Sequence, residues 1–156
     1  MLNKIIYLLI FISTLTATSS IALSKISESK ILLRENVPVQ ENSYYLRVLR
    51  AARNNSSQLE SEKVLYLIDQ LKFSPYQFER NGNLYDAEKA ANHLRSKYQR
   101  FKKTDSFRAE DFIYQAASRS SASGKPYFLV DLGGNKHLFQ EVLIRELKHL
   151  EEHLNS

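Results

Sequence analysis

The pair Asn81-Gly82 constrains the fold most, because short strand-like segments flank it on both sides. Asn-Gly favours a two-residue β-hairpin turn, since both residues accept a positive φ. The pair therefore predicts strands over residues 76–80 and 84–85, with Phe78 directly opposite Tyr85.

A second hairpin is predicted around Gly133-Gly134, which turns residues 127–132 back toward residues 137–139. In the first of these strands Phe128, Val130 and Leu132 alternate with other residues. Two hairpins in one small domain can join in a single antiparallel sheet.

The segments between the hairpins carry apolar residues three and four positions apart, which is typical of helices. Ser57 and Glu60 fit a capping box at the start of one helix, and Pro75 stops it. Asp86 caps the next helix, and Ser106 is the expected cap of a third over residues 107–118. The predicted class is α+β, with four or five helices and two short β-hairpins forming a small antiparallel sheet. Residues expected in the helical core are Val64, Leu67, Ile68, Leu71, Ala87, Ala90, Ala91, Leu94, Tyr98, Phe101, Ala109, Phe112, Ile113, Ala116, Leu143, Leu147, Leu150 and Leu154.

The chain begins with a pattern typical of a secretory signal peptide. Lys4 precedes eight apolar residues, 5–12, and small residues follow, with cleavage expected between Ala17 and Ala22. The apolar run is shorter than the roughly 20 residues that a membrane span needs, although an uncleaved anchor is the alternative. We therefore expect a periplasmic or secreted protein, divided into a signal peptide (1–22), an N-terminal extension (23–55) and a single α+β domain (56–156).

The amino-acid composition limits the kinds of fold and of reactive group that the chain can have. A content of 43% hydrophobic and 25% charged residues is that of an ordinary folded protein. Without cysteine, the chain has no disulfide, thiolate nucleophile or cysteine lipid anchor. The net charge of +5 either favours anionic partners or only aids solubility, and no nucleic-acid motif is present.

Within the extension, residues 44–53 have the pattern of a basic amphipathic helix. Such a helix either contacts an anionic membrane peripherally or packs its apolar face on its own domain. The apolar face carries Tyr45, Val48, Leu49 and Ala52, and the basic face carries Arg47, Arg50 and Arg53.

Two short segments match known catalytic motifs letter by letter but lack the further residues that the catalysis requires. His149 and His153 match an inverted zinc-protease string, but they lie at the C-terminus with no later acidic ligand. Ser27 and Lys30 satisfy the serine–lysine pattern without its partner motifs. The sequence therefore predicts no metal, no cofactor and no catalytic residue.

Two features could bind an anion. Lys89, His93, Lys97 and Arg100 form a basic stripe along one predicted helix, in which basic neighbours should keep His93 neutral. Residues 120–127 combine hydroxyls, a glycine and a lysine, which could hold an anion or simply shape a turn. The candidate binding residues are Arg80, Lys89, His93, Lys97, Arg100, Ser120, Ser121, Ser123, Lys125 and Tyr127.

Four segments, 78–82, 93–98, 109–113 and 120–127, together resemble the YfeK-like family of small exported bacterial proteins with a domain of unknown function. The resemblance spans about residues 57–150 and implies a bacterial envelope location, without an activity, ligand or catalytic residue. This chain departs from the family pattern at Lys89, where an acidic residue is common, and at Arg108, where Thr is common.

The sequence thus favours an exported, non-enzymatic domain that binds an acidic envelope protein or polymer. One alternative is an envelope hydrolase or transferase that uses His93 with a loop serine such as Ser121. Another is an inhibitor or immunity-type protein.

Overall fold

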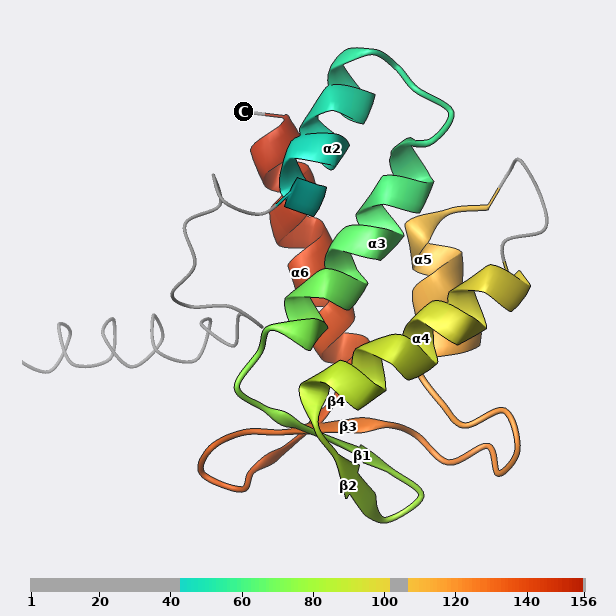
Figure 1. Cartoon of the computed structure of the whole chain (residues 1–156), viewed down its shortest axis with the longest axis vertical. Helices are drawn as coiled ribbons and strands as arrows, with labels where there is room; N and C mark the ends of the chain where they lie inside the picture. The colour runs from blue at the N-terminus through green and yellow to red at the C-terminus, as the bar shows by residue number, and fades with distance from the viewer. Residues whose placement is uncertain (1–42, 102–106, 156) are drawn as a thin grey trace, which may run out of the picture. The chain divides into compact units, whose positions relative to one another are not determined.

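Five helices and a four-stranded antiparallel sheet make up residues 43–101 and 107–155, which the computed structural model describes (Figure 1). The strands lie together below the helices in the view of Figure 1. The predicted α+β class is confirmed. In chain order the elements are α2 (Ser43–Arg53), α3 (Leu59–Lys72), β1 (Gln77–Arg80), β2 (Asn83–Tyr85), α4 (Ala87–Phe101), α5 (Ala109–Phe112) with its π-helical continuation η2 (Ile113–Ala117), β3 (Phe128–Val130), β4 (Lys136–Leu138) and α6 (Phe139–Leu154).

The strand order β2-β1-β3-β4 joins the two hairpins through an antiparallel β1–β3 pair. In the first hairpin Phe78 pairs with Tyr85, as the sequence predicts. Asn81 and Gly82 have φ values of 54° and 82°, the left-handed geometry that a two-residue hairpin turn requires. The turn therefore holds Arg80 at the end of a central strand.

The predicted alternation of β3 holds at Val130, which is buried, and is wrong at Leu132, which is 81% exposed and lies beyond the strand. Tyr127 and Leu129 are also buried. All four residues from Tyr127 to Val130 are apolar, so alternation alone does not choose the inward face. Packing makes the choice, because the Tyr127 ring lies edge-on to Phe78 with centroids 5.0 Å apart.

Helices α3, α4 and α6 pack their apolar residues into one core. Phe78 lies between the sheet and these helices, with its ring edge-on to Phe139 at the start of α6. Nearly all of the predicted helical core residues are buried, with Phe101 and Leu154 only partly so. The core therefore fixes α4 over the inner face of β1 and β3.

Two of the predicted helix starts need correction. Asp86 does cap α4, since its Oδ1 accepts a hydrogen bond from the Lys89 amide at 2.7 Å. Helix α3, however, begins at Leu59, and no side chain caps it. Glu60 instead accepts hydrogen bonds from the Ala109 amide and from Lys63, so a tertiary contact replaces the predicted capping box.

The third helix is shorter than predicted and is capped differently. Its N-cap position is Arg108, whose amide donates to Asp111 Oδ2 at 3.0 Å, rather than Ser106, which lies outside the described residues. After Phe112 the helix widens into a π-helical turn. This change of pitch directs the chain into the loop that precedes β3.

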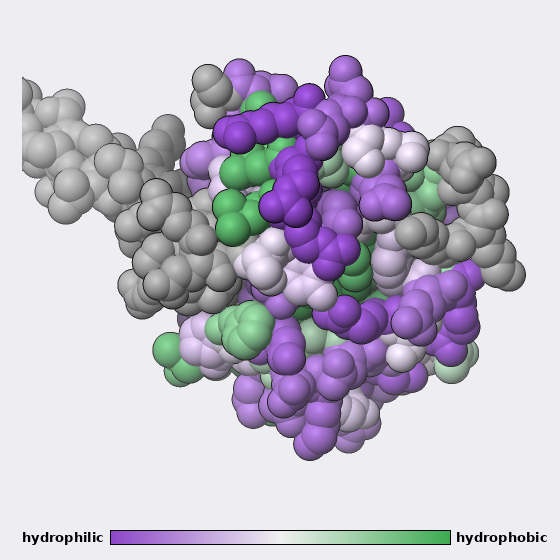
Figure 2. All heavy atoms as spheres, turned by 45° about the horizontal axis from the view of Figure 1, so that its top comes forward, coloured by the Kyte–Doolittle hydropathy of each residue, from purple (hydrophilic) through white to green (hydrophobic). Residues whose placement is uncertain are grey.

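Helix α2 packs against its own domain. Val48 is fully buried, and Arg47 forms an ion pair with Glu62 of α3 at 2.8 Å. This contact favours the packing alternative over the membrane alternative for the amphipathic segment. In the face that Figure 2 shows, hydrophilic side chains predominate and apolar atoms appear in smaller groups.

The predicted signal peptide and Ser27–Lys30 motif lie outside the described residues. Within the described ranges, no helix combines the length and the apolar character that crossing a membrane would require.

Candidate anion-binding site

The hydroxyl of Tyr127 is the centre of a basic cluster in which Lys97 and Tyr127 are buried and Arg80 and His93 are half-buried. Its oxygen lies 3.2 Å from Nε2 of His93 and 3.2 Å from Nζ of Lys97. Both partners come from α4, one helical turn apart, and Tyr127 comes from the start of the β3 segment. We call Arg80, His93, Lys97 and Tyr127 the basic cluster.

Lys97 is only 2% exposed, so this member of the predicted basic stripe lies in the interior of the domain rather than on the surface of α4. Its ammonium group donates hydrogen bonds to the Arg119 carbonyl at 2.7 Å and to Tyr127, and lies 4.9 Å from the Tyr127 ring centre. Arg119 and Tyr127 lie near the two ends of the loop before β3, so the loop contributes to the burial of the lysine. The spacing of residues along the helix could not predict this contact between Lys97 and the loop.

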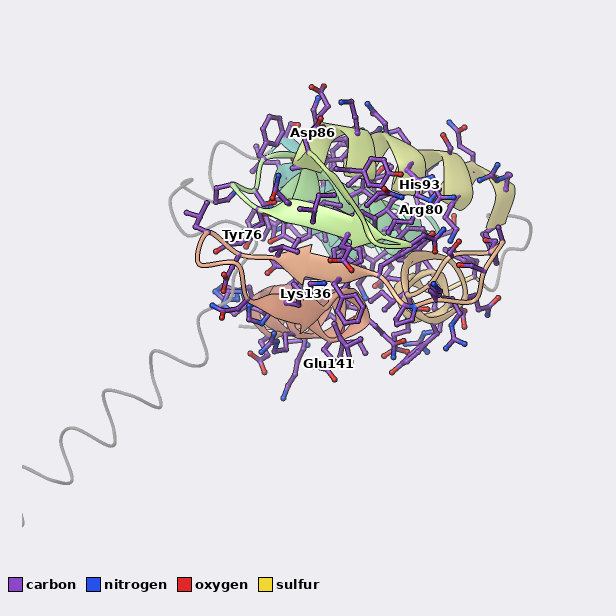
Figure 3. All side chains as sticks on the ribbon, turned by 90° about the horizontal axis from the view of Figure 1, so that it is seen from below. Tyr76, Arg80, Asp86, His93, Lys136 and Glu141 are labelled. Carbon is purple, nitrogen blue, oxygen red and sulfur yellow. The ribbon has the colours of Figure 1, made fainter. Side chains whose placement is uncertain are left out.

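Arg80, the fourth residue of the basic cluster, comes from the end of β1. Figure 3 shows its side chain beside that of His93, and its charge acts on both His93 and Lys97. The Nε atom of Arg80 is buried and has no hydrogen-bond partner in the described ranges. A buried, unsatisfied donor of this kind is costly and is rare in native proteins.

No acidic side chain neutralises these cations within the described part of the chain. The ion pairs found there include neither Arg80 nor Lys97. The ammonium of Lys97 has three N–H donors, of which protein oxygens occupy two. The cluster therefore has excess positive charge and spare hydrogen-bond donors.

Burial and repulsion set the protonation of the cluster. Burial, followed by the charges of Arg80, Lys97 and Arg100, lowers the pKa of His93 to about 4. Burial and the charges of Arg80 and Arg100 lower the pKa of Lys97 to about 8. Burial also raises the pKa of the Tyr127 hydroxyl. The prediction that His93 stays neutral is confirmed, and Lys97 is mostly charged at neutral pH.

The protonation states fix the direction of one of the two hydrogen bonds. A protonated lysine can only donate, so the Tyr127 oxygen accepts from Lys97. For the other bond we assign the Tyr127 hydroxyl as the donor to Nε2 of the neutral His93, which is one of the two roles that the imidazole tautomer allows. This assignment places the imidazole proton on Nδ1, which leaves His93 with one further N–H donor.

The hairpin tip and the loop before β3 are tied together beside the cluster. Asn81 Oδ1 accepts from the Ser123 hydroxyl at 2.6 Å, and Asn81 Nδ2 donates to the Ser120 hydroxyl at 3.5 Å. Within the loop, the Gly124 amide donates to the Ser120 carbonyl, which closes a tight turn. The sequence identifies Asn81 as a turn residue, but its tie to the loop requires the tertiary structure.

Several predicted residues lie apart from this centre. Lys89 is exposed, pairs with Asp86 at 3.0 Å, and lines a cavity of about 610 Å³ whose lining contains no residue of the basic cluster. Ser121 and Lys125 are exposed in the loop, and no hydrogen bond joins Ser121 to His93 in the described ranges. Arg100 is exposed and acts on the cluster through its charge.

The C-terminal histidines do not form a metal centre with other ligands. The His149 and His153 rings pack at 4.3 Å, and His153 Nδ1 lies 2.8 Å from the His149 carbonyl oxygen. No group of three or more metal-ligating side chains occurs in residues 43–101 and 107–155.

Residues 58–151 match DUF5329, a family of unknown function. The chain belongs to this family. The match runs from the start of α3 nearly to the end of α6 and contains all four residues of the basic cluster. Comparisons with curated proteins and with solved structures gave no match.

Proposed function

We propose that this DUF5329 protein is an exported, non-enzymatic domain whose basic cluster binds an anionic group on an acidic envelope partner. The observation that carries the proposal is the buried ammonium of Lys97, which has no carboxylate partner in the described ranges and is repelled by the charge of Arg80, whose Nε is buried and unsatisfied. An anion would supply the missing charge and acceptors.

Burying a cation without a counter-ion is unfavourable, and a second cation beside it adds repulsion. Arg80 and Lys97 show both conditions, since the Arg80 charge helps to lower the pKa of Lys97. Such a site binds an anion tightly, because charge-assisted hydrogen bonds are stronger than neutral ones and the surroundings are partly dehydrated.

The envelope location rests on two sequence observations. One is the leader pattern of Lys4 followed by the apolar residues 5–12. The other is the resemblance to the YfeK-like family of exported proteins. Acidic proteins and polymers are the anionic partners that a basic protein meets in that compartment.

The test is affinity capture from native envelope extracts, with the purified protein as bait. The matched baits are Arg80→Gln and Lys97→Met, and Arg145→Gln is the control, because Arg145 is an exposed arginine on α6 outside the cluster. We expect the wild-type protein and Arg145→Gln to retain a salt-sensitive partner that the two cluster variants lose.

Circular dichroism of each bait shows whether it remains folded. Equal capture by the wild type and by folded Arg80→Gln would contradict a role for the basic cluster. Export is tested separately by N-terminal sequencing of the protein recovered from the periplasm or the medium. We expect a mature N-terminus that results from cleavage between Ala17 and Ala22.

A further inference from the structure

We infer that the group bound by the basic cluster is a phosphate monoester dianion rather than a carboxylate. This inference rests on the proposed function and specifies its ligand class. It follows from the number of cations that act on Lys97, from the elements that carry the spare donors, and from the absence of an acidic residue among the described partners.

The charge of the cluster exceeds what one carboxylate can neutralise. Arg80 and Arg100 both act on Lys97, so three cations influence the same small volume at neutral pH. His93 adds no charge there, because its pKa lies at about 4. A carboxylate carries one negative charge, whereas a phosphate monoester carries about −1.5 to −2 at pH 7.

The spare donors come from separate elements. Arg80 at the end of β1 contributes an unpartnered Nε, and Lys97 on α4 contributes its third N–H. The Ser120 hydroxyl in the loop before β3 accepts from Asn81 and is hydrogen-bonded to the Tyr127 hydroxyl, so it is not among the spare donors. Donors that approach from two elements suit the tetrahedrally arranged oxygens of a phosphate, whereas a planar carboxylate offers only two oxygens.

A phosphate monoester could belong to a soluble metabolite, a polymer end or a lipid headgroup. The shared chemistry is the terminal phosphate, and the basic cluster recognises this group whichever molecule carries it. The test therefore first ranks small anions and then identifies the source.

The first experiment measures binding of five probes to the purified protein by isothermal titration calorimetry at pH 7.5 and constant ionic strength. The probes are inorganic phosphate, glycerol phosphate, dimethyl phosphate, acetate and malonate. We expect phosphate and glycerol phosphate to bind at least about tenfold more tightly than the other three. Dimethyl phosphate has the tetrahedral shape with one charge, and malonate has two charges on two planar groups.

The second experiment repeats the glycerol phosphate titration with Arg80→Gln and with Arg145→Gln. Loss of at least about tenfold in affinity in the first variant, with wild-type affinity in the control, would support the assignment of the site. Co-sedimentation with vesicles that contain phosphatidic acid, but not with phosphatidylglycerol vesicles, would assign the phosphate to a lipid. Binding of glycerol phosphate without co-sedimentation would assign it to a soluble metabolite or a polymer end.

Tighter or equal binding of acetate or malonate would overturn the phosphate inference and leave anion binding intact. A failure of all five probes to bind would also overturn it, and the envelope capture experiment would then decide the proposed function independently.

Discussion

The ammonium nitrogen of Lys97 lies 3.2 Å from the phenolic oxygen of Tyr127, in surroundings that leave the lysine 2% exposed. No carboxylate of residues 43–101 or 107–155 lies within the 4.0 Å of an ion pair with it. A hydrogen bond to a neutral hydroxyl compensates a buried charge only in part. The domain therefore retains an electrostatic cost that a bound anion would remove.

Arg80→Gln should stabilise the free protein and weaken anion binding at the same time. The substitution removes a cation that repels Lys97 and a buried Nε without a partner in the described part of the chain. We expect a gain of about 0.5–1 kcal/mol in the free energy of unfolding, measured with urea in phosphate-free buffer. A loss of stability of similar size would contradict this electrostatic account, and Arg145→Gln should leave both quantities unchanged.

Lys97 should make the protein more stable as the pH rises from about 8. The native pKa of Lys97 is about 8, whereas an unfolded lysine titrates near 10.5. Between these values the unfolded chain binds more protons, so the free energy of unfolding increases with pH. Urea unfolding between pH 7.5 and 9.5 should show this rise in the wild type, and Lys97→Met should lack it.

A wild-type slope that persists in Lys97→Met would assign the pH dependence to another group. The upper limit of pH 9.5 avoids general ionisation of tyrosine, whose ordinary pKa is about 10. Because Met retains much of the aliphatic length of lysine, the variant tests the charge with little loss of packing volume.

His93 should make the protein less stable as the pH falls below about 6.5, which is the same direction of pH dependence as that of Lys97 in a more acidic range. The pKa of His93 is about 4 in the native state and near 6.5 when unfolded, so the unfolded chain takes up the proton first as the pH falls. The free energy of unfolding should therefore decrease from pH 6.5 toward pH 5. His93→Gln, which can still accept a hydrogen bond from Tyr127, should reduce this decrease.

Thermal unfolding at pH 7.0, 6.0 and 5.0 measures the effect, with Arg145→Gln as the control that keeps the wild-type slope. An identical decrease in His93→Gln would mean that His93 does not titrate as its burial and basic neighbours require.

The sequence predicts those parts of the fold that depend on neighbours along the chain. Asn81-Gly82 sets the register of Phe78 opposite Tyr85, and Asp86 caps the helix that follows. Contacts between segments that are distant in the sequence cannot be predicted from local sequence patterns. Glu60 satisfies the Ala109 amide instead of its own helix start, because a tertiary partner competes with the local one.

At the candidate site, too, the sequence predicts the local features but not the contacts between distant segments. Helical spacing places His93 and Lys97 one turn apart on α4, and composition marks residues 120–127 as a possible anion loop. Spacing does not reveal that Tyr127 bonds to both side chains or that the loop buries Lys97, because both features require β3 to pack against α4.

Tyr127→Phe should remove the hydrogen-bonded link between His93 and Lys97 on α4. The substitution removes the hydroxyl that donates to His93 Nε2 and accepts from Lys97. Loss of a donor to the neutral imidazole should raise the pKa of His93 above about 4, and loss of two buried hydrogen bonds should cost about 1–3 kcal/mol. Proton NMR titration of the histidine ring measures the first effect, and an unchanged His93 titration would contradict the assigned hydrogen-bond direction.

The most direct test of anion binding is an NMR titration of the Lys97 side chain with and without saturating inorganic phosphate. Without phosphate we expect a pKa of about 8 for Lys97. With phosphate we expect this pKa to rise toward the ordinary value of 10.5, because the bound anion stabilises the charged ammonium. A Lys97 pKa that phosphate leaves unchanged would contradict phosphate binding at the basic cluster.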